Sequence, residues 1–248
     1  MPSRTQAQAE IDAGRVLVGG SVADKAARLV GADEAVVLRG DGPRFVSRGG
    51  EKLDAALGAW AIDVTGRRVL DAGASTGGFT DCVLQRGARE VVAVDVGHGQ
   101  LAWKLREDPR VVVLERTNIR NLTELPGGPA DIVVGDLSFI SLRTVAPALV
   151  AIATPAADFV LLVKPQFEAG RERVGRGGIV RDPLVHRAVL SEVVDGLAAH
   201  GLTVTAVIRS PLTGADGNVE FLAHARPAAT GVRTVAREAL DALTAVAA

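Results

Sequence analysis

The chain of 248 residues holds one cysteine, Cys82, and four scattered histidines. A single cysteine excludes an internal disulfide, and neither residue type shows the spacing of metal ligands, so no metal site is expected. No apolar run reaches the ~18 residues of a membrane-spanning helix, and the start lacks the apolar core of a signal peptide. We therefore expect a cytoplasmic protein with no membrane partner.

Aromatic side chains are also scarce. They make up 3% of the chain and include no tyrosine, which argues against binding nucleic acid by extensive base stacking. The net charge is −1, so a polyanionic partner would have to bind a local basic patch. Apolar residues reach 48%, enough for one sizeable α/β domain with a small appendage.

Lysine is rare beside arginine. The 28 basic residues include only four lysines, Lys25, Lys52, Lys104 and Lys164. An ammonium group can be made to lose its proton and a guanidinium effectively cannot, so a retained lysine indicates a role that arginine could not fill. Chance retention is an adequate explanation for Lys25 and Lys104, which lie in polar surroundings. Lys52 and Lys164 remain as candidates, although helix geometry alone would leave Lys52 in solvent.

A glycine-rich loop follows the first apolar run of the central region. The stretch 68–80, RVLDAGASTGGFT, has glycines at a spacing that does not fit G-x-G-x-x-G. A second apolar run ends in Asp95, 24 residues beyond Asp71, near the position of a ribose-binding carboxylate. This pattern favours an adenosine cofactor without a pyrophosphate, S-adenosylmethionine. The alternative is that Gly77 and Gly78 only allow close helix–strand packing.

The remaining pattern predicts an α/β fold in which strands alternate with helices. Strands are expected at 68–72, 90–95, 110–115, 130–135, 158–164, 202–209 and 218–225. Helices are expected at 3–11, 47–60, 77–86, 98–106, 118–124, 141–152, 184–200 and 231–248, and a strand pair at 36–46. The turn SPLTGADGN favours an antiparallel final hairpin, as in the seven-stranded sheet of Rossmann-like methyltransferases.

Charged residues follow several of these strands. Four of them stand at carboxyl ends: Asp71, Asp95, Asp136 and Lys164. Ligands bind parallel sheets at that edge, although any one such charge could simply reach out to water. Glu220 interrupts the last apolar run on the same face as Leu222. A buried carboxylate needs a cationic neighbour, and Lys164 is the expected partner.

Four motifs stand in order along the chain: Lys52 in SRGGEKL, Asp136 in DLSFIS, Lys164 in LVKPQFE and Glu220 in GNVEF. They resemble the Lys-Asp-Lys-Glu tetrad of RNA ribose 2′-O-methyltransferases of the FtsJ type. The sequences that flank these four residues resemble those of the TlyA family in particular, whose members are also labelled hemolysins.

The start of the chain resembles the second half of an S4-type RNA-binding domain. The matching positions are Ser3, Arg4, Ala7, Ile11, Gly14, Val16, Val18 and Gly20. The first helix of that domain has no counterpart before Ser3, so a reduced domain or a late start is expected. The predicted domains are a partial S4-like domain with a linker at 1–46, an FtsJ-type methyltransferase domain at 47–226, and a helical tail at 227–248.

The resemblance also implies roles for individual residues. The cofactor would be bound by Asp71, Gly73, Ser75, Thr76, Gly77, Gly78, Phe79, Asp95, Asn118 and Asp136. Within this set, Asp95 would take the ribose hydroxyls and Asn118 would meet the adenine. A ribose hydroxyl must lose its proton as it attacks the methyl group in line, and holding the reactants at ~3 Å lowers that barrier. Lys164 would orient or deprotonate the hydroxyl beside Lys52, with Asp136 at the sulfonium and Glu220 orienting the lysine.

RNA is expected to bind through arginines near the same rim. The segment 171–187 holds Arg171, Arg173, Arg176, Arg181 and Arg187, and its glycines predict a mobile loop that could hold phosphates. Arg4, Arg39, Arg44 and Arg48 would extend this surface. The alternative is a solvated loop in an arginine-rich protein.

Three functions compete. An RNA ribose methyltransferase acting on rRNA cytidine in ribosomal subunits, as the resemblance implies, accounts for the tetrad. A methyltransferase of another substrate class would not need two lysines and a distant glutamate, and the Asn/Asp-Pro-Pro-aromatic motif of amino-group methylation is absent after Val134. A membrane-active hemolysin is the third, but only the weakly charged tail predicts an amphipathic helix. The oligomeric state stays open.

Overall fold

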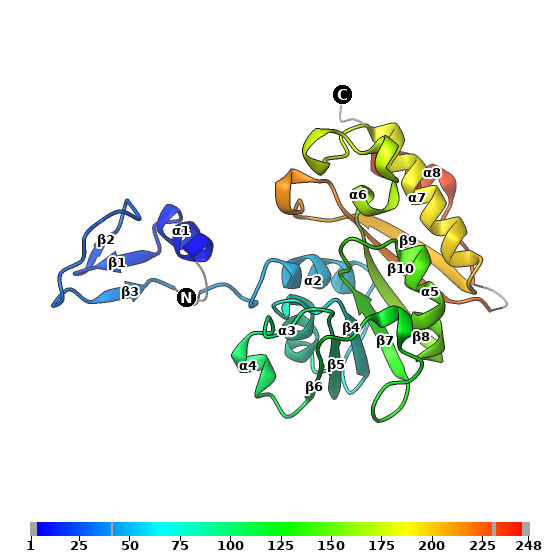
Figure 1. The fold of residues 1–248 in the computed structure, drawn as a ribbon, viewed down its shortest axis with the longest axis horizontal. Coiled ribbons are helices and arrows are strands. Elements are labelled where there is room, and N and C mark those ends of the chain that lie inside the picture. The colour runs from blue at the N-terminus through cyan, green and yellow to red at the C-terminus, as the bar shows by residue number, and fades with distance from the viewer. Residues whose placement is uncertain (1–3, 41, 230–231, 245–248) are drawn as a thin grey trace. The chain divides into compact units, whose positions relative to one another are not determined.

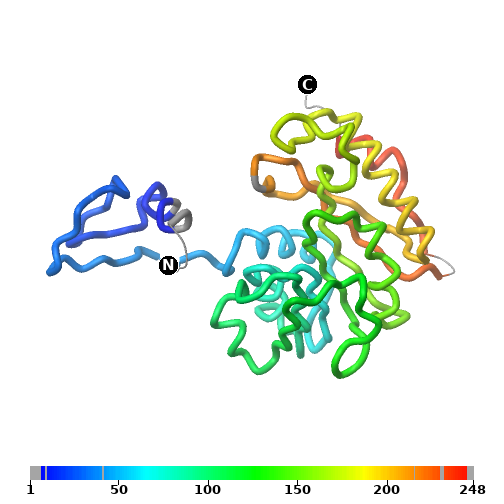
Figure 2. Tube along the Cα trace, in the orientation of Figure 1, coloured from blue at the N-terminus to red at the C-terminus, as the bar shows by residue number. Residues whose placement is uncertain are grey.

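The structure is a computed structural model that describes residues 4–40, 42–229 and 232–244, without the side chains of residues 4–6, 9 and 215. The chain forms two compact units, Met1–Arg44 and Phe45–Ala248, which can be followed along the chain in Figure 1 and Figure 2. Ser3 and parts of the predicted tail helix lie outside the described residues. Among those that are described, no helix has the length and apolar character needed to cross a bilayer.

The first unit is a helix followed by a small antiparallel sheet. Helix α1 (Arg4–Asp12) precedes β1 (Val16–Val18), β2 (Ser21–Val22) and β3 (Val36–Leu38), paired in the order β2-β1-β3. Its core is thin, with Val16, Val18 and Ala23 buried and Ile11 packed against them. Gly14 turns the chain after α1 with φ +66°, a conformation that favours glycine.

The second unit contains the predicted seven-stranded sheet. Its strands are β4 (Arg68–Ala72), β5 (Glu90–Val94), β6 (Val111–Leu114), β7 (Ala130–Gly135), β8 (Ala153–Val163), β9 (Leu202–Arg209) and β10 (Phe221–Pro227). They lie in the order β6-β5-β4-β7-β8-β10-β9. Neighbours from β6 to β8 are parallel, whereas β10 runs antiparallel to both β8 and β9. The predicted fold class and final hairpin are confirmed.

Helices cover both faces of this sheet (Figure 1). One face packs against α2 (Gly49–Ala59), α3 (Gly78–Gln85) and α4 (Trp103–Arg106), and the other against α5 (Leu142–Ala151), α7 (Pro183–Ala198) and α8 (Arg237–Thr244). The short α6 (Pro165–Glu168) follows β8 directly. Alternate strand residues enter opposite cores: Leu70 and Val133 face α5 and α7, and Val69 and Ile132 face α2 and α3.

Three predicted elements are wrong in extent. Residues 118–124 form only a 3-10 turn at Ile119–Asn121, and the predicted helix 98–106 shrinks to α4. The described part of 39–46 contains no second strand. Gly40 and Gly42 have φ of +88° and +70°, which breaks extended structure, and Phe45 is buried against Gly50. Local glycine geometry and one buried ring therefore replace the expected strand.

Candidate active site

The glycine loop between β4 and α3 runs close to the loop that follows β7. Gly73 N donates a 2.8 Å hydrogen bond to Val94 O. A Cβ on Gly73, which has φ +86°, would lie 2.7 Å from Asp136 O, and one on Gly78 would lie 3.0 Å from Gly50 N. Close packing therefore accounts for part of the glycine pattern. The same loop also lines two neighbouring pockets.

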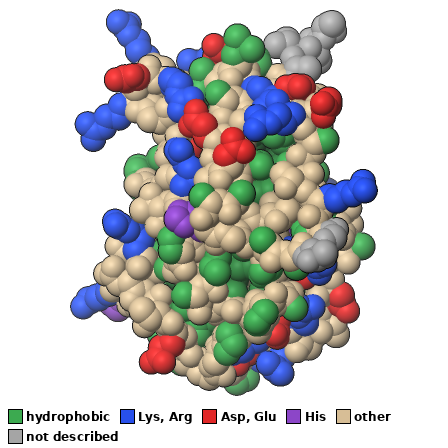
Figure 3. Space-filling model, turned by 90° about the vertical axis from the view of Figure 1, so that its right-hand side faces the viewer, with side chains coloured by type: hydrophobic (Ala, Val, Ile, Leu, Met, Phe, Trp, Pro, Cys, Tyr) green, Lys and Arg blue, Asp and Glu red, His purple; other side chains and the backbone are tan. Residues whose placement is uncertain are grey.

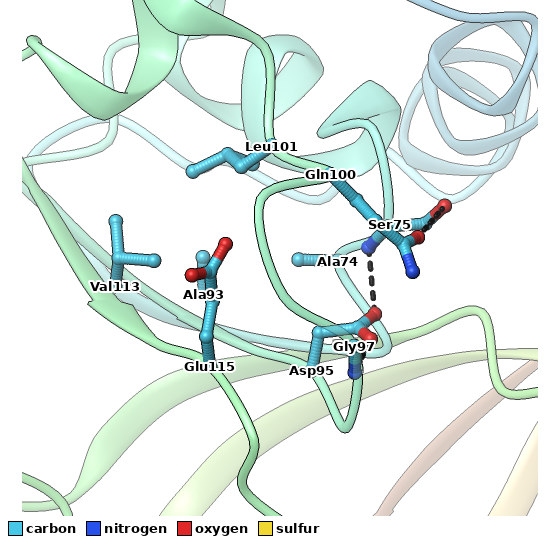
Figure 4. A pocket seen from close by; sticks show the side chains of 9 residues that line it. All are labelled: Ala74, Ser75, Ala93, Asp95, Gly97, Gln100, Leu101, Val113 and Glu115. Atoms are coloured by element: carbon cyan, nitrogen blue, oxygen red, sulfur yellow. Dashed lines mark hydrogen bonds between the residues drawn. The ribbon is translucent and has the colours of Figure 1, made fainter.

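The first pocket lies between the glycine loop and the ends of β5 and β6 (Figure 4). Its lining is Ala74, Ser75, Ala93, Asp95, Gly97, Gln100, Leu101, Val113 and Glu115. Asp95 accepts hydrogen bonds from Ser75 N at 2.8 Å and from Gly97 N at 2.6 Å. A carboxylate therefore fixes both backbone segments that form the mouth of the pocket.

Glu115 is a pocket residue that sequence reasoning missed. A hydrogen bond from Arg106, with others from Gly99 N and His98, lowers the pKa of Glu115 to about 2. The signal was available, because Glu115 directly follows β6 as Asp95 directly follows β5. Asn118, by contrast, is exposed and does not line the pocket. Its side chain accepts from Arg120 N and caps the 3-10 turn.

Asp71 lies beneath the loop rather than in either pocket. It is fully buried and accepts a 2.6 Å hydrogen bond from Thr80 Oγ1, while its Oδ1 has no hydrogen-bond partner among the described residues. Burial raises the pKa of Asp71 to about 7, opposed by the bond from Thr80. Asp71 therefore supports the loop, and its predicted contact with the cofactor stays a prediction.

The buried carboxyl of Asp71 predicts an unusual pH dependence of stability. The folded state keeps this proton up to about pH 7, whereas the unfolded chain loses it near 3.8. The contribution of Asp71 to the free energy of unfolding should therefore fall as pH rises from about 4 to 7, by at most ~1.4 kcal/mol per pH unit. Urea denaturation at pH 5 and at pH 8 measures this. The free energy of unfolding should fall less between the two pH values in Asp71→Asn than in the parent. An identical loss in both would contradict the assignment.

The second pocket lies on the other side of the glycine loop, under the start of α2. It is lined by Ser47, Arg48, Gly49, Lys52, Gly73, Ala74, Ser75, Thr76, Gly78, Phe79 and Asp136. It shares Ala74 and Ser75 with the first pocket. A ligand lying across these residues would reach from Asp95 to Lys52 and Asp136.

Lys52 and Asp136, which line this pocket, each belong to a lysine–carboxylate pair. Lys52 Nζ lies 2.5 Å from Glu220 Oε2, and Lys164 Nζ lies 2.6 Å from Asp136 Oδ1. Lys164 also donates a 2.9 Å hydrogen bond to Ser138 Oγ. The structure thus brings all four predicted catalytic residues to one rim and adds Ser138, which the sequence analysis did not single out.

The partner of Glu220 differs from the prediction. Extending the β8–β10 register from the pair Val163 and Phe221 does put Glu220 beside Lys164, as expected. The ion pair nevertheless forms with Lys52. Leu222, on the same face of β10, belongs to the core that packs under α2. Glu220 therefore points towards α2, and Lys52 is the cation on that helix.

An exposed aromatic residue follows Ser138, to which Lys164 donates a hydrogen bond. Phe139 is 91% exposed and has φ +64°, a conformation uncommon for a bulky residue. Its ring lies 4.9 Å from that of Phe167, and Lys164 Nζ lies 5.9 Å from the Phe167 ring. Sequence reasoning missed Phe139 because composition counts aromatics without placing them.

The predicted RNA-binding arginines fall into two groups. Arg171, Arg176 and Arg181 are exposed and form no ion pair with another described residue. Arg173 instead binds both carboxylate oxygens of Glu192, at 2.7 and 2.9 Å, and donates to Ala169 O. The guanidinium of Arg173 is therefore already bound to Glu192 and to the backbone of Ala169.

This segment is more ordered than its glycine content predicted. It contains two 3-10 turns, Arg171–Arg173 and Arg176–Gly178. The buried side chain of Asn218 accepts from Val180 N and donates to Gly178 O, both at 3.0 Å. Residues 178 and 180 are thus tied to Asn218, and the mobility of the segment stays a prediction.

The other predicted arginines lie elsewhere. Arg48 is exposed and lines the second pocket, and Arg187 pairs with Asp241. Arg39 and Arg44 are exposed in the first unit, while the side chain of Arg4 lies outside the described part. On the face in Figure 3, basic and acidic side chains are interspersed, so that face shows no extended patch of one sign.

The fold and the site together define a Rossmann-like methyltransferase with two lysine–carboxylate pairs at its rim. Residues 45–226 match the description FtsJ-like methyltransferase, and residues 2–36 match the S4 domain. The chain belongs to the FtsJ-like methyltransferase family, which confirms the resemblance.

Relatives extend this assignment. The chain is 55% identical over 221 residues to the 16S/23S rRNA (cytidine-2′-O)-methyltransferase TlyA of Mycobacterium tuberculosis, covering 88% of this chain and 82% of that one. It is 48% identical over 229 residues to YqxC of Bacillus subtilis, named as an rRNA methyltransferase, covering 90% and 80%. A solved structure from Streptococcus thermophilus that carries a hemolysin name is 40% identical, with a TM-score of 0.82 over 98% and 90% of the chains.

Proposed function

We propose that this protein transfers a methyl group from S-adenosylmethionine to the ribose 2′-hydroxyl of a cytidine in rRNA. The observation that carries the proposal is the pairing of Lys164 with Asp136 and of Lys52 with Glu220 at one pocket beside the glycine loop. The similarity to an rRNA (cytidine-2′-O)-methyltransferase supports the substrate class. Ribosomal subunits are the proposed partner and the cytoplasm the proposed place of action.

The two pockets fit the cofactor. The first offers Asp95 to the ribose hydroxyls and the apolar Leu101 and Val113 to the adenine. The second offers glycine-loop backbone to the methionine part, next to Lys52 and Asp136. When bound, S-adenosylmethionine supplies an electrophilic methyl group on a sulfonium. The carboxylate of Asp136 is suited to lie near that positive charge.

Lys164 orients and deprotonates the ribose 2′-hydroxyl. Its ammonium has three N–H donors. Ser138 Oγ accepts from one of them, and Asp136 lies 2.6 Å away as an ion-pair partner, so a donor remains for the 2′-oxygen. This contact orients the hydroxyl and stabilises the negative charge that develops on oxygen. Lys164 first transfers one ammonium proton to the Asp136 carboxylate. The neutral amine then takes the hydroxyl proton as the methyl group would pass from sulfur to the 2′-oxygen, which leaves Asp136, whose side chain is 25% exposed, protonated. The exposed ring of Phe139, which follows Ser138 in the chain, offers a face on which one base could stack.

The direct test is methyl transfer from labelled cofactor to ribosomal subunits, free rRNA and a small-molecule extract. Label in rRNA that resists alkaline hydrolysis and maps to a cytidine ribose is expected. Label on a base or in small molecules only would favour the methyltransferase of another substrate class.

Asp95→Ala should weaken cofactor binding at least tenfold, because two ribose hydroxyls lose a charged acceptor contributing ~1.5–3 kcal/mol. Isothermal titration calorimetry measures this directly. Asp108→Ala, which removes an aspartate paired with Arg110 away from both pockets, is the control and should bind as the parent does. Unchanged affinity in Asp95→Ala would remove Asp95 from the cofactor site.

RNA binding should separate the arginines of segment 171–181. Arg171→Glu, Arg176→Glu and Arg181→Glu should each weaken RNA binding and reduce the slope of log K against log salt by ~1, because each removes a phosphate contact. Arg89→Glu, an exposed arginine at the amino end of β5, is the matched control. Filter binding at several salt concentrations checks this, and equal slopes in all four variants would make the segment a solvated surface.

A further inference from the structure

Two loops that carry catalytic residues interlock beyond the lysine–carboxylate pair. The loop after β7 carries Asp136 and ends at Ser141, and the turn after β8 carries Lys164 and continues into α6. Lys164 contacts Asp136 and Ser138, and Phe167 packs on Phe139. A third set of contacts is made by Glu168, a residue that the mechanism does not use.

Glu168 is a buried carboxylate, 4% exposed, at the end of α6. Its Oε2 accepts a 2.6 Å hydrogen bond from Ser141 Oγ, and its Oε1 accepts a 2.7 Å bond from Leu142 N. Arg143 lies 3.6 Å away and donates to the backbone carbonyl of Glu168 at 3.1 Å. Burial raises the pKa of Glu168, opposed by these hydrogen bonds. Every polar atom of the carboxylate is therefore directed at the start of α5.

The loop that Glu168 holds is under strain. Phe139 keeps a left-handed backbone conformation, φ +64°, while its side chain is 91% exposed. A bulky residue remains in that region only where the surrounding contacts over-determine it. Lys164 and Phe167 hold one end of the loop, and Glu168 holds the other through Ser141 and Leu142. Without Glu168, the loop would be free to relax, and Asp136 and Ser138 would move with it.

We propose that Glu168 is a positioning residue that latches the loop 136–141 to the Lys164 turn and so keeps Asp136 and Ser138 against the Lys164 ammonium. The inference rests on the proposed function and deepens it. Glu168 touches neither pocket, so it acts only through the geometry of the other residues. Its loss should lower the rate of the chemical step and leave cofactor affinity unchanged.

The test compares four full-length variants by single-turnover methylation of ribosomal subunits at saturating cofactor, each corrected for its folded fraction. Glu168→Ala should lose at least tenfold in rate. Glu168→Gln should stay within about threefold of the parent, because the amide can accept from Leu142 N and donate to Ser141 Oγ. Ser141→Ala removes one of the two bonds and should lose an intermediate amount, so it replaces Glu168→Ala if that variant does not fold.

Asp158→Asn is the control, since Asp158 is a buried carboxylate in β8, the strand that precedes the Lys164 turn, and is bound to His224 and Arg226. It tests whether loss of a buried carboxylate in general slows the reaction, and it should keep the parental rate per folded molecule. A parental rate in Glu168→Ala, or an equal loss in Asp158→Asn, would overturn the latch.

Hydrogen exchange separates failure of the latch from failure of the proposed function. Amides 137–142 should exchange at least tenfold faster in Glu168→Ala than in the parent, and at parental rates in Glu168→Gln and Asp158→Asn. If the parent protein transfers no methyl group to RNA, the proposed function fails, and this exchange pattern alone then decides the latch. Unchanged exchange in Glu168→Ala would overturn it.

Discussion

Lys164→Arg is expected to reduce methyl transfer at least 100-fold, equivalent to ~2.7 kcal/mol in the barrier, while cofactor and RNA still bind. The Lys164 ammonium lies 2.6 Å from Asp136 and 2.9 Å from Ser138, and the side chain is only 12% exposed. A planar guanidinium is bulkier than an ammonium and cannot occupy that position, and it cannot release a proton. Both properties that the mechanism needs are therefore lost, although the positive charge is kept.

Single-turnover methylation with saturating cofactor is the measurement. Lys104→Arg is the matched control, because Lys104 forms an ion pair with Asp81 at 3.0 Å but is 58% exposed. A lysine that only carries charge at the surface tolerates arginine, so this variant should keep the parental rate. Activity of Lys164→Arg within threefold of the parent would remove Lys164 from catalysis, and the mechanism would have to be rebuilt around Lys52.

Glu220→Ala is expected to lower the free energy of unfolding of the second unit by ~3–5 kcal/mol, because it leaves the Lys52 ammonium buried without its partner. Glu220 is 3% exposed and Lys52 is 8% exposed. Replacing both members by apolar residues of similar volume is often neutral for stability. The double variant Lys52→Met/Glu220→Leu should therefore recover most of the loss.

The same pair of variants separates stability from chemistry. Both tryptophans, Trp60 and Trp103, lie in the second unit, so denaturation followed by their fluorescence reports on that unit. The double variant should be folded and bind cofactor, yet remain inactive if Lys52 and Glu220 serve the reaction. A folded double variant with parental activity would reduce this ion pair to a structural contact.

Much of the fold could be predicted from local pattern. The apolar strand segments, the turn-rich link before Glu220 and the glycine loop are short-range features, and each is visible within about ten residues of sequence. The antiparallel last strand followed from the short link between β9 and β10. Predictions that depended on helix length fared worse at 98–106 and 118–124. Gly99, with φ +69°, keeps the residues before Trp103 out of the helix, and Leu122, with an extended backbone, ends the turn after Asn121.

By itself, the sequence determined the seven-stranded methyltransferase sheet and singled out Lys52, Asp136, Lys164 and Glu220. Strand patterns and short motifs can both be recognised from residues that are neighbours in the chain. Only the tertiary structure decided how those charges pair. Lys52 and Glu220 are 168 residues apart, and they meet because α2 packs over β10. The hydrogen bonds of Arg173 to Glu192 and of Ser141 to Glu168 likewise depend on how segments distant in sequence pack together. The sequence shows which residues are charged. Which two of them pair depends on how the helices and strands pack, because packing decides which charges come within bonding distance.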